Sequence, residues 1–253
     1  MKVAFVGKGG AGKSALAGTL CRVLARRGQK VLALDADHVP GLALSIGLPA
    51  GDGWILSEAA AFREGRGWEH LMTPVEAVER FALSGPDGVR FLQFGKTTAQ
   101  MSREQQASAV AFLEIVRNYE QEGVAVVIDL AAGTRQSYLG WTGVARTVLV
   151  VVEPSEKSLL TARRILRLRE ERPEIALLGV ANKIGGAAQR RRVAAGLQRI
   201  GIPYWAEVPE DHVFGRAERE GRPPIEVDPA SGAVRALEEM ADRLVEGAAG
   251  PRC

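Results

Sequence analysis

Cysteine is nearly absent from this chain, which has only Cys21 and Cys253 among its 253 residues. Two cysteines this far apart, without the close spacing of metal ligands, form neither a disulfide framework nor a zinc or iron–sulfur motif. Sparse cysteine of this kind is typical of a reducing compartment, so a cytoplasmic location is expected. Cys21 falls in an apolar helical pattern and is expected to pack in the core.

Long hydrophobic runs are missing as well, and no stretch of about 18 apolar residues predicts a membrane-spanning helix. The apolar segment 3–6 comes without a basic leader before it. No repeat, low-complexity tract or linker divides the sequence, so residues 1–253 are predicted to form one domain.

The net charge of +3 is only a small excess of basic over acidic residues. Its longest basic run, residues 190–192, is expected on a solvated helix face, and nucleic acid is not an expected partner.

The sequence does contain short apolar runs that alternate with longer segments in which apolar residues recur at helical spacing. Several runs lack polar residues on both faces, which indicates strands covered by helices on both sides. This alternation predicts an α/β fold with a doubly wound, mostly parallel sheet. The expected strands are 3–6, 31–34, 91–94, 124–128, 148–152, 175–180 and 204–208, and the expected helices are 15–27, 103–120, 157–171, 187–200 and 232–246.

The first expected strand leads into a glycine-rich segment from Gly7 to Ser14, which reads Gly-Lys-Gly-Gly-Ala-Gly-Lys-Ser. It matches the P-loop pattern in its strand–loop–helix context. Glycines let backbone N–H groups point inward around a phosphate, and the helix N terminus adds a favourable dipole. Lys13 is expected to contact the β- and γ-phosphates, and Ser14 to place its hydroxyl on Mg²⁺. Nucleotide contacts are predicted at Gly9, Gly10, Ala11, Gly12, Lys13, Ser14 and Ala15.

A second lysine, Lys8, stands near the start of the loop. With this lysine the chain resembles the deviant Walker A ATPases, the P-loop family of MinD, ParA, the nitrogenase iron protein and the CooC-type maturation factors. The resemblance implies ATP hydrolysis and a homodimer that sandwiches two nucleotides, in which Lys8 reaches the phosphates of the partner subunit. Lys8 and Lys13 would then both stabilise charge on the transferred phosphoryl group. Taken alone, Lys8 would be an ordinary solvated loop lysine.

Carboxylates stand at two further strand ends, where parallel sheets bind their ligands. By resemblance, Asp37 after the second strand orients the attacking water near Mg²⁺, and Asp35 assists the metal shell. Asp129, after the strand 124–128, would hold Mg²⁺ through water. Residues 131–133 then resemble a mobile switch. The catalytic set is therefore Lys8, Lys13 and Asp37, and the metal set is Ser14, Asp37 and Asp129.

Asn182 and Lys183 follow the strand 175–180, where the family places an asparagine against the base. A guanine site would need an acid at position 185, which is Gly185 in this chain. An amide both donates and accepts hydrogen bonds and suits the adenine edge, so ATP and ADP are expected. The family's second base-proximal loop corresponds to Val208, Pro209 and Glu210.

The segment 152–165 looks most like the CooC-type ATPases, which help to load nickel into carbon monoxide dehydrogenase. Those proteins carry a Cys-x-Cys pair near residues 95–111, whereas this chain has no cysteine between Cys21 and Cys253. We expect a Mg²⁺-dependent ATPase that works as a dimeric switch in metalloenzyme maturation, with itself and an unidentified client protein as partners. The alternative is a MinD- or ParA-type positioning ATPase that acts on DNA, a surface or a protein. The polar face of the predicted helix 232–246 has more acidic than basic residues, whereas a membrane-binding amphipathic helix is usually basic on that face.

Overall fold

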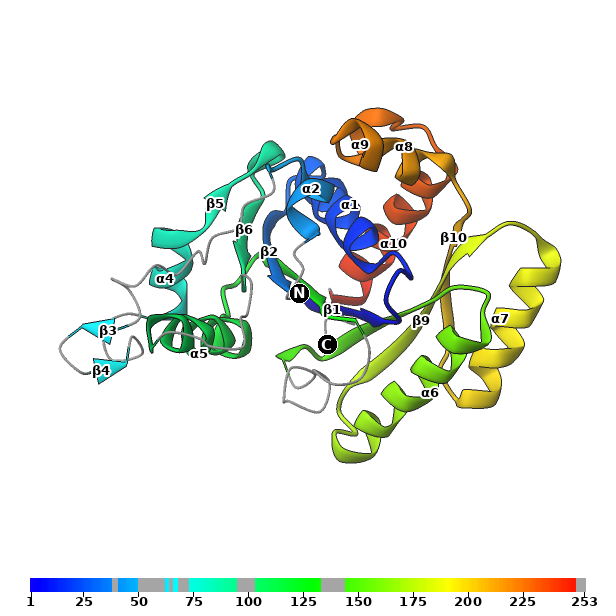
Figure 1. The fold of residues 1–253 in the computed structure, drawn as a ribbon, viewed down its shortest axis with the longest axis horizontal. Coiled ribbons are helices and arrows are strands. Elements are labelled where there is room, and N and C mark those ends of the chain that lie inside the picture. Colours follow the sequence, from blue (N-terminus) through cyan, green and yellow to red (C-terminus); the bar gives the residue numbers. More distant parts are fainter. Residues whose placement is uncertain are drawn as a thin grey trace.

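The computed structural model describes residues 1–37, 41–49, 62–63, 66–67, 73–94, 103–132 and 144–248 (Figure 1). The strands are β1 (Lys2–Gly7), β2 (Lys30–Ala36), β3 (Phe62–Arg63), β4 (Arg66–Gly67), β5 (Leu83–Ser84), β6 (Arg90–Gln93), β7 (Val124–Leu130), β8 (Thr147–Val152), β9 (Ala176–Ile184) and β10 (Tyr204–Pro209). The helices are α1 (Lys13–Arg26), α2 (Leu42–Ile46), α4 (Pro74–Phe81), the short 3₁₀ helix η2 (Pro86–Gly88), α5 (Arg103–Asn118), α6 (Glu156–Glu171), α7 (Ala187–Ile200), α8 (His212–Glu220), α9 (Pro224–Val227) and α10 (Gly232–Ala248).

One sheet of eight strands runs through the middle of the fold in the order β10-β9-β8-β1-β7-β2-β6-β5 (Figure 1). Neighbouring strands pair in parallel from β10 to β6, and the edge strand β5 pairs with β6 antiparallel. The first strand of the chain is therefore a central strand with later strands on both sides. This arrangement confirms the predicted doubly wound, mostly parallel α/β sheet.

Alternate side chains of the strands supply two hydrophobic layers, one on each face of the sheet. In β1, Ala4 and Val6 pack in the layer that α4, α5, α6 and α7 cover. Val3 and Phe5 point to the opposite layer, which is covered chiefly by α1 and α10. The apolar stripe of α10 is thus buried against the sheet, as expected for a core helix rather than a membrane-binding one.

Strand register gathers the loops that matter for function at one edge of the sheet. Gly7 at the end of β1 is paired with Val151 in β8, and Val152 is paired with Ala181 in β9. On the other side of β1, Asp35 in β2 lies opposite Asp129 in β7. Because parallel strands end at the same edge, the segments after β1, β2, β7, β8 and β9 are close neighbours although they are far apart in sequence.

Helices α2, α4, α8 and α9 are present although none of them is among the predicted helices. For α4 a signal existed, because Thr73 and Glu76 form a capping box and Pro74 occupies the first helical turn. The sequence also predicts a short helix within the irregular segment 51–67 and a polar loop at 95–102. Apart from β3 and β4, both segments lie outside the described residues, as do His38, Gly133 and Cys253. Among the described helices, none is long and apolar enough to cross a membrane.

Candidate nucleotide-binding site

Two glycines of the P-loop occupy positions that no larger residue could take. Gly7 has a φ of +154°, and a Cβ atom there would lie 2.5 Å from the carbonyl oxygen of Val151. Gly12 has a φ of +95°, and its Cβ would lie 2.4 Å from Nδ2 of Asn182. The loop is therefore packed between β8 and β9 closely enough to require glycine at both points.

Helix α1 begins directly behind this loop, at Lys13. Its N-cap is Gly12, which has no side-chain oxygen to accept from the first N–H groups of the helix. A phosphate can accept from these groups and gains from the helix dipole. Lys13 is almost completely buried at the start of this helix, where a bound phosphate would compensate its charge.

Asp129 has the most unusual environment among the described carboxylates. It is fully buried, and neither carboxylate oxygen has a hydrogen-bond partner within the described residues. Burial, reinforced by the charge of the neighbouring Asp35, raises the pKa of Asp129 to about 8 against the opposing effects of Ser14 and Lys13. A buried acid without partners is costly unless a ligand compensates it. The site therefore fits a divalent cation between Asp129 and Ser14.

Asp35 makes backbone contacts that its sequence position does not indicate. Its carboxylate accepts backbone N–H groups from Asp37 at 3.0 Å, from Gly41 at 3.1 Å and from Leu42 at 3.0 Å. These bonds hold both ends of the segment that contains Asp37. Burial nevertheless raises the pKa of Asp35 to about 6. Asp35 thus positions the backbone at Asp37 and at the start of α2, and the metal set of Ser14, Asp37 and Asp129 stays a prediction.

A cleft of about 690 Å³ opens above the P-loop and extends toward α8 and α9. Most of the predicted site residues meet there. The predicted residues that line it are Gly9, Gly10, Gly12, Lys13, Ser14, Ala15, Asp37, Asn182, Lys183, Pro209 and Glu210. Ala11 and Asp129 lie buried beside it, whereas Val208 is buried in the hydrophobic layer under α1 and α10.

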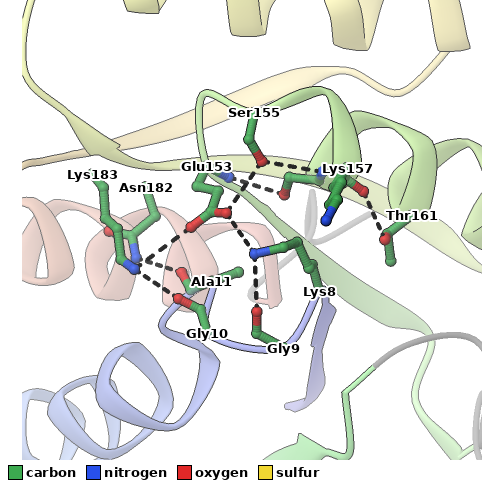
Figure 2. A network of polar contacts seen from close by, with 11 residues as sticks. Lys8, Gly9, Gly10, Ala11, Glu153, Ser155, Lys157, Thr161, Asn182 and Lys183 are labelled. Atoms are coloured by element: carbon green, nitrogen blue, oxygen red, sulfur yellow. Dashed lines mark hydrogen bonds and ion pairs between the residues drawn. The ribbon is translucent and has the colours of Figure 1, made fainter.

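Asn182 lines this cleft and has a buried side-chain acceptor. Its Nδ2 donates to the carbonyl oxygen of Ala11 at 2.7 Å, which fixes the orientation of the amide (Figure 2). Its Oδ1 is buried and has no partner in the described part of the chain. An acceptor of this kind matches the N6 amino group of adenine and opposes the O6 oxygen of guanine. The geometry therefore supports the predicted preference for adenine.

The sequence reading missed Glu153, which joins the site from the end of β8. Its carboxylate lies between two lysines, at 2.7 Å from Nζ of Lys8 and 3.5 Å from Nζ of Lys183 (Figure 2). Lys183 also donates to the carbonyl oxygen of Gly10 at 2.6 Å. Lys8 is consequently held beside the P-loop and is not among the residues that line the cleft.

Comparison with known proteins agrees with this geometry. The family of CobQ/CobB/MinD/ParA nucleotide binding domains matches residues 3–225. The chain belongs to this family. The match runs from β1 into α9 and so includes the P-loop, the acidic strand ends and the base-proximal loops.

Individual relatives have different tasks. The carbon monoxide dehydrogenase accessory protein CooC of Rhodospirillum rubrum is 29% identical over 199 residues, which cover 73% of this chain and 74% of that protein. The septum site-determining protein MinD of Bacillus subtilis is 26% identical over 245 residues, with coverages of 94% and 86%. Among solved structures, MinD of Pyrococcus horikoshii complexed with Mg-ADP superposes with a TM-score of 0.69 at 20% identity, covering 99% and 98% of the two chains.

These findings confirm the predicted family and fold. The family match also confirms the prediction of a P-loop ATPase, and its use of ATP together with Mg²⁺ stays a prediction. The residues present fit both groups, because the glycine cradle and Lys13 suit phosphates and the partnerless Asp129 suits a cation. The roles of the individual site residues all remain predictions.

Selectivity for adenine should depend on Asn182. We expect the protein to bind an ATP analogue at least about tenfold more tightly than the matching GTP analogue, because one buried acceptor left unpaired or opposed costs about 1–3 kcal/mol. Asn182→Ala should bring that ratio close to one in a fluorescent-nucleotide titration. Lys183→Ala is the matched control, since it also removes a side-chain bond to the P-loop but leaves Oδ1 in place. An unchanged ratio in Asn182→Ala would contradict this role.

Proposed function

We propose that this chain is a Mg²⁺-dependent ATPase that dimerises around ATP and serves as an accessory factor in metalloenzyme maturation. The observation that supports ATP-dependent dimerisation is the different placement of the two P-loop lysines. Lys13 lines the cleft of its own chain, whereas Lys8 lies beside it and has a side chain that is 30% exposed. A lysine that does not reach the phosphates of its own site is suited to act on those of a second copy.

The residues of the site divide the work of hydrolysis. Lys13 and the N–H groups of α1 hold the phosphates and stabilise the charge that develops on them. Asp37, kept in place through Asp35, orients the attacking water. Ser14 and Asp129 would hold Mg²⁺, which supplies charge neutralisation between the phosphates when it is bound. Loss of the γ-phosphate would then relax the contacts around the phosphate site and release the partner subunit.

Maturation is the favoured task because the CooC-like segment at residues 152–165 contributes Glu153 to the site, and because CooC is a relative over most of its length. Positioning is the second candidate, supported by similarity to MinD. The basic run on α7 gives it little support as a DNA surface. Arg190 is paired with Glu207, and Arg192 with Glu156, so two of these arginines have their charge balanced within the chain.

Binding of the ATP-locked protein to defined partners separates the two tasks. We expect the protein, with Mg²⁺ and a non-hydrolysable ATP analogue, to bind immobilised nickel-free carbon monoxide dehydrogenase, and its ADP form to bind at least about tenfold more weakly. The same ATP-locked sample should not sediment with anionic phosphatidylglycerol vesicles or shift a DNA duplex at physiological salt. Retention on vesicles or DNA that requires the ATP analogue would favour the positioning task instead.

A further inference from the structure

The parallel pairing of β1 with β8 brings Lys8 and Glu153 close together, because each follows the end of its strand. Gly7 is paired with Val151, so the next residue of one strand, Lys8, and a residue just past the end of the other, Glu153, emerge side by side. Lys8 Nζ donates to Glu153 Oε1 at 2.7 Å and to the carbonyl oxygen of Gly9 at 3.1 Å (Figure 2). Both contacts turn the side chain back over its own P-loop.

Glu153 is itself fixed in position from several directions. The hydroxyl of Ser155 donates to Oε1 at 3.1 Å, and the backbone N–H of Glu153 donates to Oγ of the buried Ser158 at 3.1 Å. Burial alone would raise the pKa of Glu153, but hydrogen bonds from Lys8 and Ser155 and the charges of Lys8 and Lys183 lower it. The carboxylate is thus ionised at neutral pH and ready to pair with either lysine.

Lys183 provides a second cation for the same carboxylate. It lies 3.5 Å from Oε2 of Glu153 and is anchored to the carbonyl oxygen of Gly10. Its φ of +59° places a non-glycine residue in the sparsely populated left-handed region, a kind of strain that concentrates at functional sites. With Lys183 in place, Glu153 keeps an ionic partner when Lys8 moves away.

We propose that Glu153 is a positioning residue that holds Lys8 on its own P-loop in the monomer, and that this ion pair opens when Lys8 reaches the phosphates of a second copy. This inference rests on the proposed dimeric switch. In it Glu153 competes with the partner's nucleotide for one lysine. ADP, which lacks the γ-phosphate, competes poorly, so the pair keeps the protein monomeric until ATP is present.

Glu153→Gln tests the proposal because it keeps the shape of the side chain and removes its charge. In the nucleotide-free monomer, acylation of Lys8 by an amine-reactive ester, followed by mass spectrometry, should become several times faster. In the presence of Mg²⁺ and a non-hydrolysable ATP analogue, the dimer dissociation constant should fall by about tenfold, because each of the two subunits gives up one partly exposed ion pair. Glu156→Gln is the control, since it removes the same charge three residues away and breaks the pair with Arg192.

The two readouts separate this inference from the proposed function. Faster labelling together with a tighter dimer supports the proposal. Unchanged labelling, or a dimer that is weaker than or equal to that of the unmodified protein, overturns it. Faster labelling without ATP-dependent dimers in either chain supports the ion pair and contradicts the dimeric switch.

Discussion

Replacing Asp129 with asparagine is expected to stabilise the nucleotide-free protein while abolishing its Mg²⁺-dependent stabilisation by ATP. The buried carboxylate has no hydrogen-bond partner in the described ranges, and burial raises its pKa, so the folded chain carries the ionised form at a cost in stability that Ser14 and Lys13 offset only in part. Removing that charge should raise the free energy of unfolding by about 1–3 kcal/mol. For a chain of this size that corresponds to several degrees in melting temperature, at about 2–4 °C for each kcal/mol.

The stabilisation of the nucleotide-free protein by Asp129→Asn should increase with pH. The pKa of Asp129 is raised from 3.8 to about 8, so the folded chain retains a proton that the unfolded chain releases at lower pH. Stability should therefore fall as pH rises between these two values, and the asparagine variant should lack this fall. Urea unfolding at pH 5 and pH 8.5 measures the difference, which should be larger at the higher pH. A variant less stable than the parent at pH 8.5 would contradict the assignment.

The second expected effect of Asp129→Asn is the loss of the stabilisation that Mg-ATP gives to the folded protein. At 100 times its dissociation constant, Mg-ATP should stabilise the parent protein by about 2.7 kcal/mol. The Asp129→Asn variant should show little of this gain, because its amide is a poor ligand for Mg²⁺. Asp242→Asn is the matched control. That aspartate is exposed and paired with Arg27 at the surface, so its change should stay within about 0.5 kcal/mol and leave nucleotide binding intact.

Local sequence patterns were sufficient to predict much of the fold and the position of the P-loop. Alternating apolar runs predicted the strands of the parallel sheet, and the spacing from Gly7 to Ser14 predicted the loop before α1. Such signals lie within a few neighbouring residues, where steric and hydrogen-bonding preferences act. The capping box at Thr73 was an equally local signal for α4, and it was available in the sequence.

Other features depend on contacts that no local pattern contains. Glu153 meets Lys8 because β8 lies beside β1, and the order of strands in the sheet is set by the packing of the whole chain. Asp35 accepts three backbone N–H groups that the turn after β2 brings to its carboxylate, which its residue type alone does not indicate. The side chain of Val208 is buried in the core, because the strand period continues to it, and the contact of its loop with the base stays a prediction. For both acids, the groups that fold around the side chain decide its contacts.

Replacing Lys8 with alanine is expected to abolish ATP-dependent dimerisation while leaving nucleotide binding by the monomer within about threefold of the parent. The reason is geometric, because Lys8 is not among the residues that line the cleft and its contacts are with Glu153 and Gly9. A cation that stabilises transferred phosphoryl charge contributes about 10³–10⁵-fold to turnover in related reactions. The ATPase rate of the variant should therefore fall by about a hundredfold or more. Lys157→Ala, on the exposed start of α6, removes the same charge nearby and should change neither property.

Size-exclusion chromatography with light scattering tests the switch most directly. The protein should be compared without nucleotide, with Mg-ADP, and with Mg²⁺ and a non-hydrolysable ATP analogue, alongside Lys8→Ala and Lys157→Ala. We predict that the parent and Lys157→Ala shift from monomer to dimer only with the ATP analogue, and that Lys8→Ala remains monomeric throughout. A parent protein whose mass does not respond to nucleotide, or a Lys8→Ala variant that dimerises like the parent, would contradict the account.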